Sequence, residues 1–335
     1  MFKKLPRWLP GALLSLIAIL ILAFTVNWNA VGLAFSRMNW RLFPLFVAGY
    51  LISITCRAMV SRTLLKRVPT LRMAFITLMQ GYLLNNILPF RLGELGRAFL
   101  LGNQAKLGTL QVFSTIVIER AYDLAISAIL LLVTLPLVIQ TDWLRPVAYA
   151  TLAIVLLALF SLYLMARYQA NLQRLVTRLG GRYHFVQRFV LPGMDSFLRG
   201  LSALTDVRVF GMSLAWMTAT WTIGAAGYYA LLLAFVPGAP FWWILFTLAA
   251  VSLGAALPSA PAALGVFEAS IVAALSLLGV DAGTALAFAV TWHAFHFGVT
   301  LIIGLYGFGE EGQSLMDTYR QLSRRRPQDT GAGVS

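Results

Sequence analysis

The stretch NNILPFRLGELGR, residues 85–97, places three charged side chains, two amides and helix-breaking residues inside an otherwise apolar chain. It follows the apolar run 73–84 and precedes the apolar run 98–101. A charged side chain at the centre of a bilayer costs about 2.5–3.5 kcal/mol on insertion scales, so this stretch indicates a buried polar site. Its proline and glycines favour a broken or re-entrant helix, which is where transporters form their binding sites.

The composition of the chain is that of a membrane protein. Of its 335 residues, 59% are hydrophobic and 11% are charged, with a mean hydropathy of +0.79. A soluble globular domain carries about 25% charged residues. The apolar run 9–26 follows three basic residues without a clear cleavage site, so we interpret it as an uncleaved transmembrane helix. The sequence therefore predicts an all-α, polytopic helical bundle in a membrane.

Two pairs of short apolar segments predict helical hairpins. Residues 73–88 and 90–101 flank the first tip, and residues 241–257 and 266–280 flank the second. A helix over 73–88 would be about 24 Å long, which falls short of the roughly 30 Å hydrocarbon core. We therefore expect two re-entrant hairpins beside about six full transmembrane helices.

The two hairpins predict an internal repeat. We expect one transmembrane domain over residues 1–308, containing a first repeat at about 42–139 and a second at about 209–308, and then a basic tail at 309–335. Each tip carries a proline and a glycine four residues apart with a glutamate soon after: Pro89, Gly93 and Glu94, then Pro261, Gly265 and Glu268. Inverted repeats with helices interrupted at corresponding positions are typical of transport sites.

The formal charge of +14 indicates orientation rather than nucleic-acid binding. With re-entrant hairpins and a cytoplasmic N-terminus, the cytoplasmic segments, including the basic loop 167–208, hold 19 of the 26 lysines and arginines. The outside segments hold three. This is the positive-inside pattern. We expect both termini in the cytoplasm, an inner (plasma) membrane location and no nucleic-acid partner. Ten full spans would keep most of this bias, so charge leaves that alternative open.

The first polar constellation lies at the first tip. The spacing of Arg91, Glu94 and Arg97 places them on one helix face as a charge ladder. Arginine forks match phosphate geometry, and helix N-termini add partial positive charge. The tip therefore predicts a site for a phosphate-bearing headgroup, to which we also assign Asn85, Asn86 and Pro89. The alternative is a hairpin end in the headgroup region with snorkelling arginines.

A second constellation, Glu119, Arg120 and Asp123, lies inside the apolar run 112–139. Glu119 and Asp123 share a helix face at i, i+4, and Arg120 can pair with Asp123 at i, i+3. If the first turns of this helix protrude into the cytoplasm, these charges are only interfacial.

Further candidates lie in the second half of the chain. Glu268 is an isolated carboxylate that should pair across the fold with an arginine, a histidine or a helix end, or be protonated. His293 and His296 share a face of the last helix, which favours a polar interior face, with a proton relay or a headgroup contact as the alternative. Pro258 and Pro261 complete the candidate binding residues at the second tip.

Catalytic and metal motifs are scarce. The chain has one cysteine and three histidines, so we expect no metal site and no cofactor. It contains no HExxH, GxSxG, P-loop or Asp-rich diphosphate motif, and we expect no enzyme activity.

At these residues the chain resembles the lysylphosphatidylglycerol synthase transmembrane-region family, the flippase-like domain of the multiple peptide resistance factor. The first family element is matched by Asn86, Leu88, Pro89, Arg91, Gly93, Glu94 and Arg97. A Glu-Arg-x-x-Asp element is matched by Glu119, Arg120 and Asp123, and a late element by Leu257, Pro258, Pro261, Gly265 and Glu268. The family's glycine pair is replaced by Ala262 and Ala263. Because the chain ends about 25 residues after its last apolar segment, the resemblance implies lipid translocation or binding rather than lipid synthesis.

The sequence thus predicts a protein that moves an anionic phospholipid or other lipid-linked phosphate headgroup between leaflets. The arginines would contact the phosphate, and the carboxylates would hold the arginines and could accept an amine. Membrane phospholipids or lipid-linked headgroups are the expected partners. The first alternative is a membrane-embedded enzyme acting on a phospholipid or polyprenyl-phosphate lipid. The second is an accessory subunit for a separate lipid-modifying enzyme.

Overall fold

The computed structural model describes residues 9–88, 92–138, 144–180, 183, 186–254 and 260–310, and every regular element within these ranges is helical. This confirms the all-α prediction for the described part of the chain. The longer helices are α1 (Leu9–Thr25), α3 (Phe43–Leu64), α4 (Leu71–Ile87), α6 (Thr109–Val138), α7 (Leu144–Arg167), α10 (Val207–Phe235) and α13 (Ala282–Glu310). The shorter ones are α2 (Trp28–Arg37), α5 (Leu92–Gln104), α8 (Gln169–Gly180), α9 (Leu191–Leu201), α11 (Phe241–Gly254) and α12 (Val266–Leu277).

The helices include several that are long and apolar enough to cross a membrane. By length and composition, three pass this test: residues 40–64, α6 and α13. Two further spans would be possible if each bent pair of helices counts as one, namely α1 with α2 at 82° and α7 with α8 at 77°. The structure therefore supports a membrane protein with three to five candidate spans in its described residues.

Helix α2 is an element that the sequence analysis does not predict. Asn27 accepts hydrogen bonds from the backbone N–H groups of Asn29 and Ala30, which is the usual role of an N-cap residue. This cap starts a new helix directly after α1, at a sharp angle to it.

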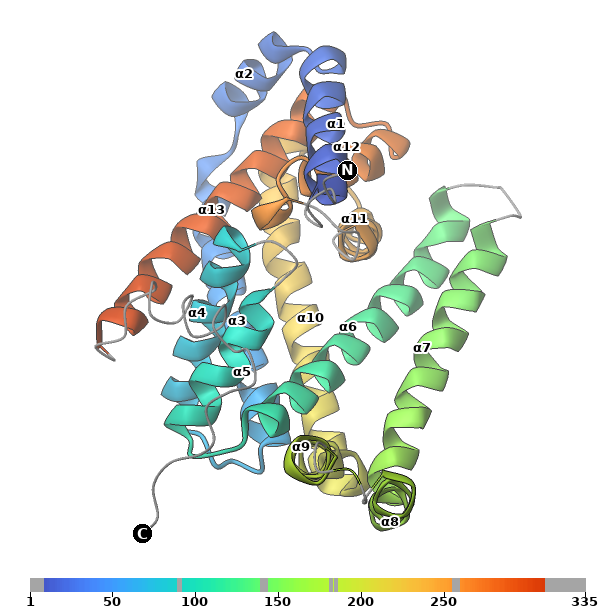
Figure 1. Cartoon of the computed structure of the whole chain (residues 1–335). Coiled ribbons are helices and arrows are strands. Elements are labelled where there is room, and N and C mark those ends of the chain that lie inside the picture. The colour runs from blue at the N-terminus through green and yellow to red at the C-terminus, as the bar shows by residue number, and fades with distance from the viewer. Residues whose placement is uncertain are drawn as a thin grey trace, which may run out of the picture.

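The most extensive contact between two of the described helices joins α3 and α10, and α10 runs through the middle of the molecule in Figure 1. Gly49 and Gly227 face each other at the crossing, where a side chain added at Gly49 would meet the backbone of Gly227 at 2.6 Å. Small residues let helix backbones approach closely, which is a common basis of helix association in membranes.

Two helix pairs are short. Helices α4 and α5 pack together, as do α11 and α12. Residues 89–91 of the first tip and residues 255–259 before and within the second tip lie outside the described residues. At 1.5 Å per residue, α4 is about 26 Å long and the other three are about 18–21 Å. The four helices start and end within a few residues of the predicted segments.

The contacts made by helices α3–α6 correspond to those made by helices α10–α13. Helix α4 packs against α13, and α11 packs against α6. Helix α5 packs against α6, and α12 packs against α13. Helices α8 and α9 lie across the lower end of α6 and α7 in Figure 1, at the opposite end of the molecule from α1 and α2.

Candidate functional site

Six charged side chains from three helices form two neighbouring sets of ion pairs, which together are called the ionic network. One set is Arg97 with Glu119, and the other consists of Arg57, Glu94, Arg120 and Asp123. The most buried contact of the network joins α5 to α6. Arg97 donates from Nη1 to Glu119 Oε2 at 2.9 Å and from Nη2 to Glu119 Oε1 at 3.0 Å. Two parallel charge-assisted hydrogen bonds of this kind are stronger and more specific in geometry than a single neutral hydrogen bond. Glu119 is wholly buried, and only 3% of Arg97 is exposed.

Asp123 on α6 is the centre of the network. It pairs with Arg57 of α3, and Arg120 Nη2 approaches its Oδ2 at 3.2 Å. The indole N–H of Trp221, from α10, donates to Asp123 Oδ1 at 3.1 Å. The predicted i, i+3 pair of Arg120 and Asp123 is confirmed, and the two additional donors explain how a carboxylate can remain buried.

Arg120 also connects α6 to α5. Its Nε lies 3.5 Å from Glu94 Oε1, and both side chains are partly exposed. This is the longest ion pair in the network. The expected ladder along one helix is wrong for its described members, because Glu94 and Arg97 each reach across to α6.

The two asparagines hold the first hairpin in place. Asn85 Oδ1 accepts the backbone N–H of Gly93 at 2.8 Å, and the Asn86 amide donates to Thr300 of α13 at 2.9 Å. A side chain at Gly93 would meet the backbone oxygen of Gly81 at 2.1 Å, so glycine permits α4 and α5 to pack this closely. In the structure both amides therefore have positions fixed by helix packing.

Glu268 lies in the first turn of α12 and has two of the expected partners, a helix end and a histidine. It accepts the backbone N–H of Gly265 at 2.7 Å and pairs with the imidazole Nδ1 of His293. Pro261 begins the turn that precedes this helix, and Ala262 and Ala263 there have φ values of +58° and +54°. Positive φ is uncommon for alanine, and such residues often mark functional segments.

The two histidines of α13 have different partners. His293 meets Glu268, whereas His296 Nδ1 lies 2.7 Å from the hydroxyl of Tyr50 on α3. Within the part of the chain that the structure describes, no group of three or more His, Cys, Asp or Glu could hold a metal ion.

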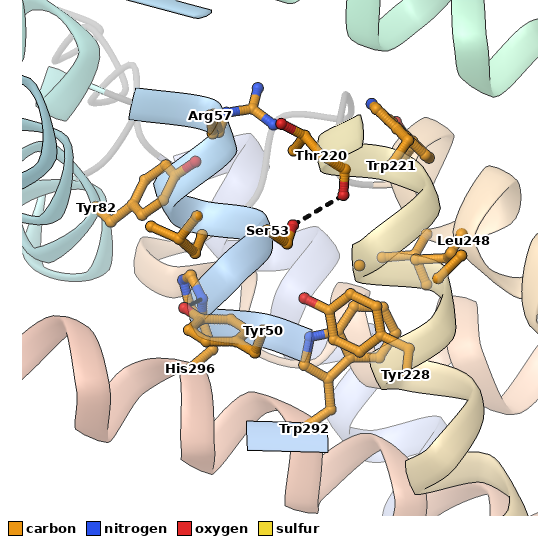
Figure 2. A pocket seen from close by; sticks show the side chains of 15 residues that line it. Tyr50, Ser53, Arg57, Tyr82, Thr220, Trp221, Tyr228, Leu248, Trp292 and His296 are labelled. Atoms are coloured by element: carbon orange, nitrogen blue, oxygen red, sulfur yellow. Dashed lines mark hydrogen bonds between the residues drawn. The ribbon is translucent and has the colours of Figure 1, made fainter. Parts of the chain in front are cut away.

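A cavity of about 210 Å³ lies between α3, α4, α10, α11 and α13. Figure 2 shows Arg57 and Trp221 at one end and Tyr50, His296, Tyr228 and Trp292 at the other. Since Arg57 belongs to both, the cavity adjoins the ionic network. Neither Glu94 nor Glu268 lines it, so these glutamates do not face this particular cavity.

A family model described as the lysylphosphatidylglycerol synthase TM region matches residues 10–304. The chain belongs to this family. Members of the lysylphosphatidylglycerol synthase TM region are membrane proteins related to lipid handling, which agrees with the apolar helices described above. No curated protein and no solved structure gives a significant match.

Three of the candidate binding residues predicted from the sequence lie outside the described residues, namely Pro89, Arg91 and Pro258. The structure adds Arg57, which sequence reasoning did not assign to the site. The signal was present, because Arg57 is the one charged residue in the apolar run 42–60. Its partner Asp123 is 66 residues away, so the pair could not be recognised from local spacing.

Proposed function

We propose that this protein translocates an anionic phospholipid, or another lipid-linked phosphate headgroup, between membrane leaflets without acting as an enzyme. The observation that carries the proposal is the ionic network, which gathers three arginines where α3, α5 and α6 meet. Charges inside a membrane region are costly, and in transporters they mark the route of a polar cargo.

The network leaves donors for a phosphate. Within the described residues, the Nε atoms of Arg57 and Arg97 are buried without a hydrogen-bond partner. A phosphate oxygen can take such a donor in the geometry that suits guanidinium groups. Entry would begin at Glu94 and Arg120, since this pair is the longest and the most exposed of the network.

The proposal includes an inverted repeat that relates α3–α6 to α10–α13. The matched helix contacts support it, and so do matched polar contacts. Arg97 pairs with Glu119 between α5 and α6, as Glu268 does with His293 between α12 and α13. Asn86 binds Thr300 between α4 and α13, as Ser252 does with Ser127 between α11 and α6.

The hairpins are proposed to be re-entrant, with their tips near the middle of the membrane. Helices of about 18–26 Å are shorter than the roughly 30 Å hydrocarbon core. Contact between α4 and the turn Pro261–Ala263 brings the end of one hairpin toward the other. The positive-inside bias supports cytoplasmic termini in an inner (plasma) membrane.

The test is leaflet exchange of fluorescent phospholipids in liposomes containing the purified protein. The key variant is the double substitution Arg97→Gln with Glu119→Gln, which removes both charges of the buried pair. Removing one partner alone would leave a buried unpaired charge and cost about 3–5 kcal/mol of stability. We expect the double variant to remain folded and to lose exchange activity.

The matched control is Arg199→Gln with Asp195→Gln, which removes an exposed i, i+4 pair on α9. This control should exchange lipid at the wild-type rate. Wild-type exchange in the Arg97 and Glu119 double variant would overturn the role of the network, and no exchange by the wild type would overturn the proposed function.

A further inference from the structure

The cavity between α3, α4, α10, α11 and α13 is small. Its volume is about 210 Å³, below the roughly 300–1,000 Å³ of pockets that enclose drug-sized ligands. One wall comes from α3 and α4 and the other from α10, α11 and α13, so it lies between the two halves of the molecule. Binding sites of transporters built from repeats lie at such an interface.

We propose that this cavity is a headgroup subsite selecting lipids that carry a phosphate and uncharged hydroxyl groups, such as glycerol or a sugar, over lipids that carry an amine. The inference rests on the proposed function, because it takes a lipid headgroup to enter the protein. It adds the chemical class of the headgroup and a set of residues that the ionic network does not include.

The charge of the lining favours a phosphate. Of the fifteen lining residues, Arg57 alone carries a fixed charge; His296 is the other basic group and is bound to Tyr50. No carboxylate is among those fifteen, since Asp123 approaches Arg57 from outside the lining. A phosphate can meet the guanidinium group, whereas an ammonium group would find no carboxylate to pair with.

The polar groups of the lining are mostly hydroxyls. Ser53 already donates to the backbone oxygen of Thr220 at 2.9 Å, as the dashed line in Figure 2 shows, and the hydroxyl of Tyr50 is bound to His296. Tyr82 differs, because its hydroxyl has no hydrogen-bond partner among the described residues. A phenol can both donate and accept, as hydroxyls of a glycerol or sugar require.

The aromatic side chains do not form a good cage for a cation. An ammonium group binds over the open face of an aromatic ring. Tyr228 and Trp292 cover each other, with ring centroids 3.9 Å apart and planes inclined by 33°, and Phe267 packs edge-on against Trp292 at 5.2 Å. The indole N–H of Trp221 is held by Asp123. The faces of Tyr228 and Trp292 therefore provide apolar walls rather than a cation site.

The test compares phosphatidylglycerol with phosphatidylserine, which have the same net charge but differ in hydroxyl and amine groups. Leaflet exchange of each acyl-labelled lipid is measured in liposomes, and retention of each by the detergent-purified protein is measured by native mass spectrometry. We expect the wild type to exchange and retain phosphatidylglycerol preferentially. A polyprenyl-phosphate hexose in the same assays separates a sugar from a glycerol headgroup, and preference for either over phosphatidylserine supports the inference.

The diagnostic variant is Tyr82→Phe, and the control is Tyr149→Phe on the exposed face of α7. Losing one hydrogen bond should lower exchange of the hydroxylated lipid about two- to tenfold and leave phosphatidylserine unchanged. Equal exchange of both lipids, faster exchange of phosphatidylserine, or a preference that survives Tyr82→Phe overturns the inference while leaving translocation intact. Selective retention without any exchange overturns translocation while leaving the headgroup preference intact.

Discussion

Asp123 receives donors from three helices, namely Arg57 of α3, Arg120 of its own helix and Trp221 of α10. Arg97 and Glu119, one helical turn away, form a separate and more buried pair. A buried ion pair contributes little net stability, because desolvation of both charges offsets their attraction. Stability of the fold alone therefore gives little reason for the network, and the proposed function assigns it to binding of a cargo.

Substituting Glu94→Gln tests the entry to the network. The Glu94–Arg120 contact is long and partly exposed, so its loss should change stability by less than about 1 kcal/mol. We expect lipid exchange in liposomes to fall at least about tenfold, which corresponds to about 1.4 kcal/mol in the barrier. Thermal unfolding of the same preparation is the control, and an unchanged exchange rate in a stable variant would contradict the assignment.

Some side-chain pairs of the site could be predicted from the sequence, because the two residues are neighbours on one helix or because few side chains could pair with them. The pair of Arg120 with Asp123 follows from their spacing, and the isolated Glu268 was expected to pair with a histidine, an arginine or a helix end, or to be protonated. The ion pair between Arg57 and Asp123 depends on how α3 packs against α6, and a pattern of neighbouring residues in the sequence does not predict this packing. The cavity depends on five helices at once, so its aromatic lining could not be assembled from the sequence.

Individual helices are arranged so that backbones meet at glycines. Gly49 of α3 and Gly227 of α10 form the central crossing, and Gly81 and Gly93 bring α4 against α5. The lengths of these helices follow from the apolar runs, so they could be predicted within a few residues. Helix α2 was missed because it is short and its start depends on the cap at Asn27.

Substituting Gly49→Ala should destabilise the crossing of α3 and α10. The added methyl group would lie 2.6 Å from Gly227 Cα, and overpacking of this kind costs about 1–3 kcal/mol. Thermal unfolding in detergent measures the loss. Gly211→Ala on α10 is the matched control, because nothing lies within 4 Å of the added group and alanine favours a helix by about 0.8–1.0 kcal/mol. Equal stability of the two variants would show that the close approach is not required.

The molecule as a whole has two halves with corresponding contacts, joined by the basic segment that contains α8 and α9. In the proposed orientation this segment faces the cytoplasm, and α2 faces outside. The sequence predicts this arrangement from charge alone, because lysines and arginines are retained on the cytoplasmic side.

Cysteine labelling tests the orientation. Cys56 is the chain's single cysteine and is buried, so Cys56→Ala provides a background for new cysteines. A membrane-impermeant maleimide should label Arg174→Cys on α8 only in inside-out vesicles, and Ser36→Cys on α2 only in right-side-out vesicles. Labelling of both positions from the same side would contradict the topology.

The most direct measurement of translocation is a titration of protein per vesicle. Liposomes carry fluorescent phosphatidylglycerol in both leaflets, and an impermeant quencher removes the outer signal. Protein-free vesicles should keep about half of their fluorescence. We predict that the protected fraction falls in proportion to the vesicles that contain at least one wild-type protein, and that Glu94→Gln at the same density restores protection. A protected fraction that stays at the protein-free value at every wild-type density would contradict lipid translocation by this protein.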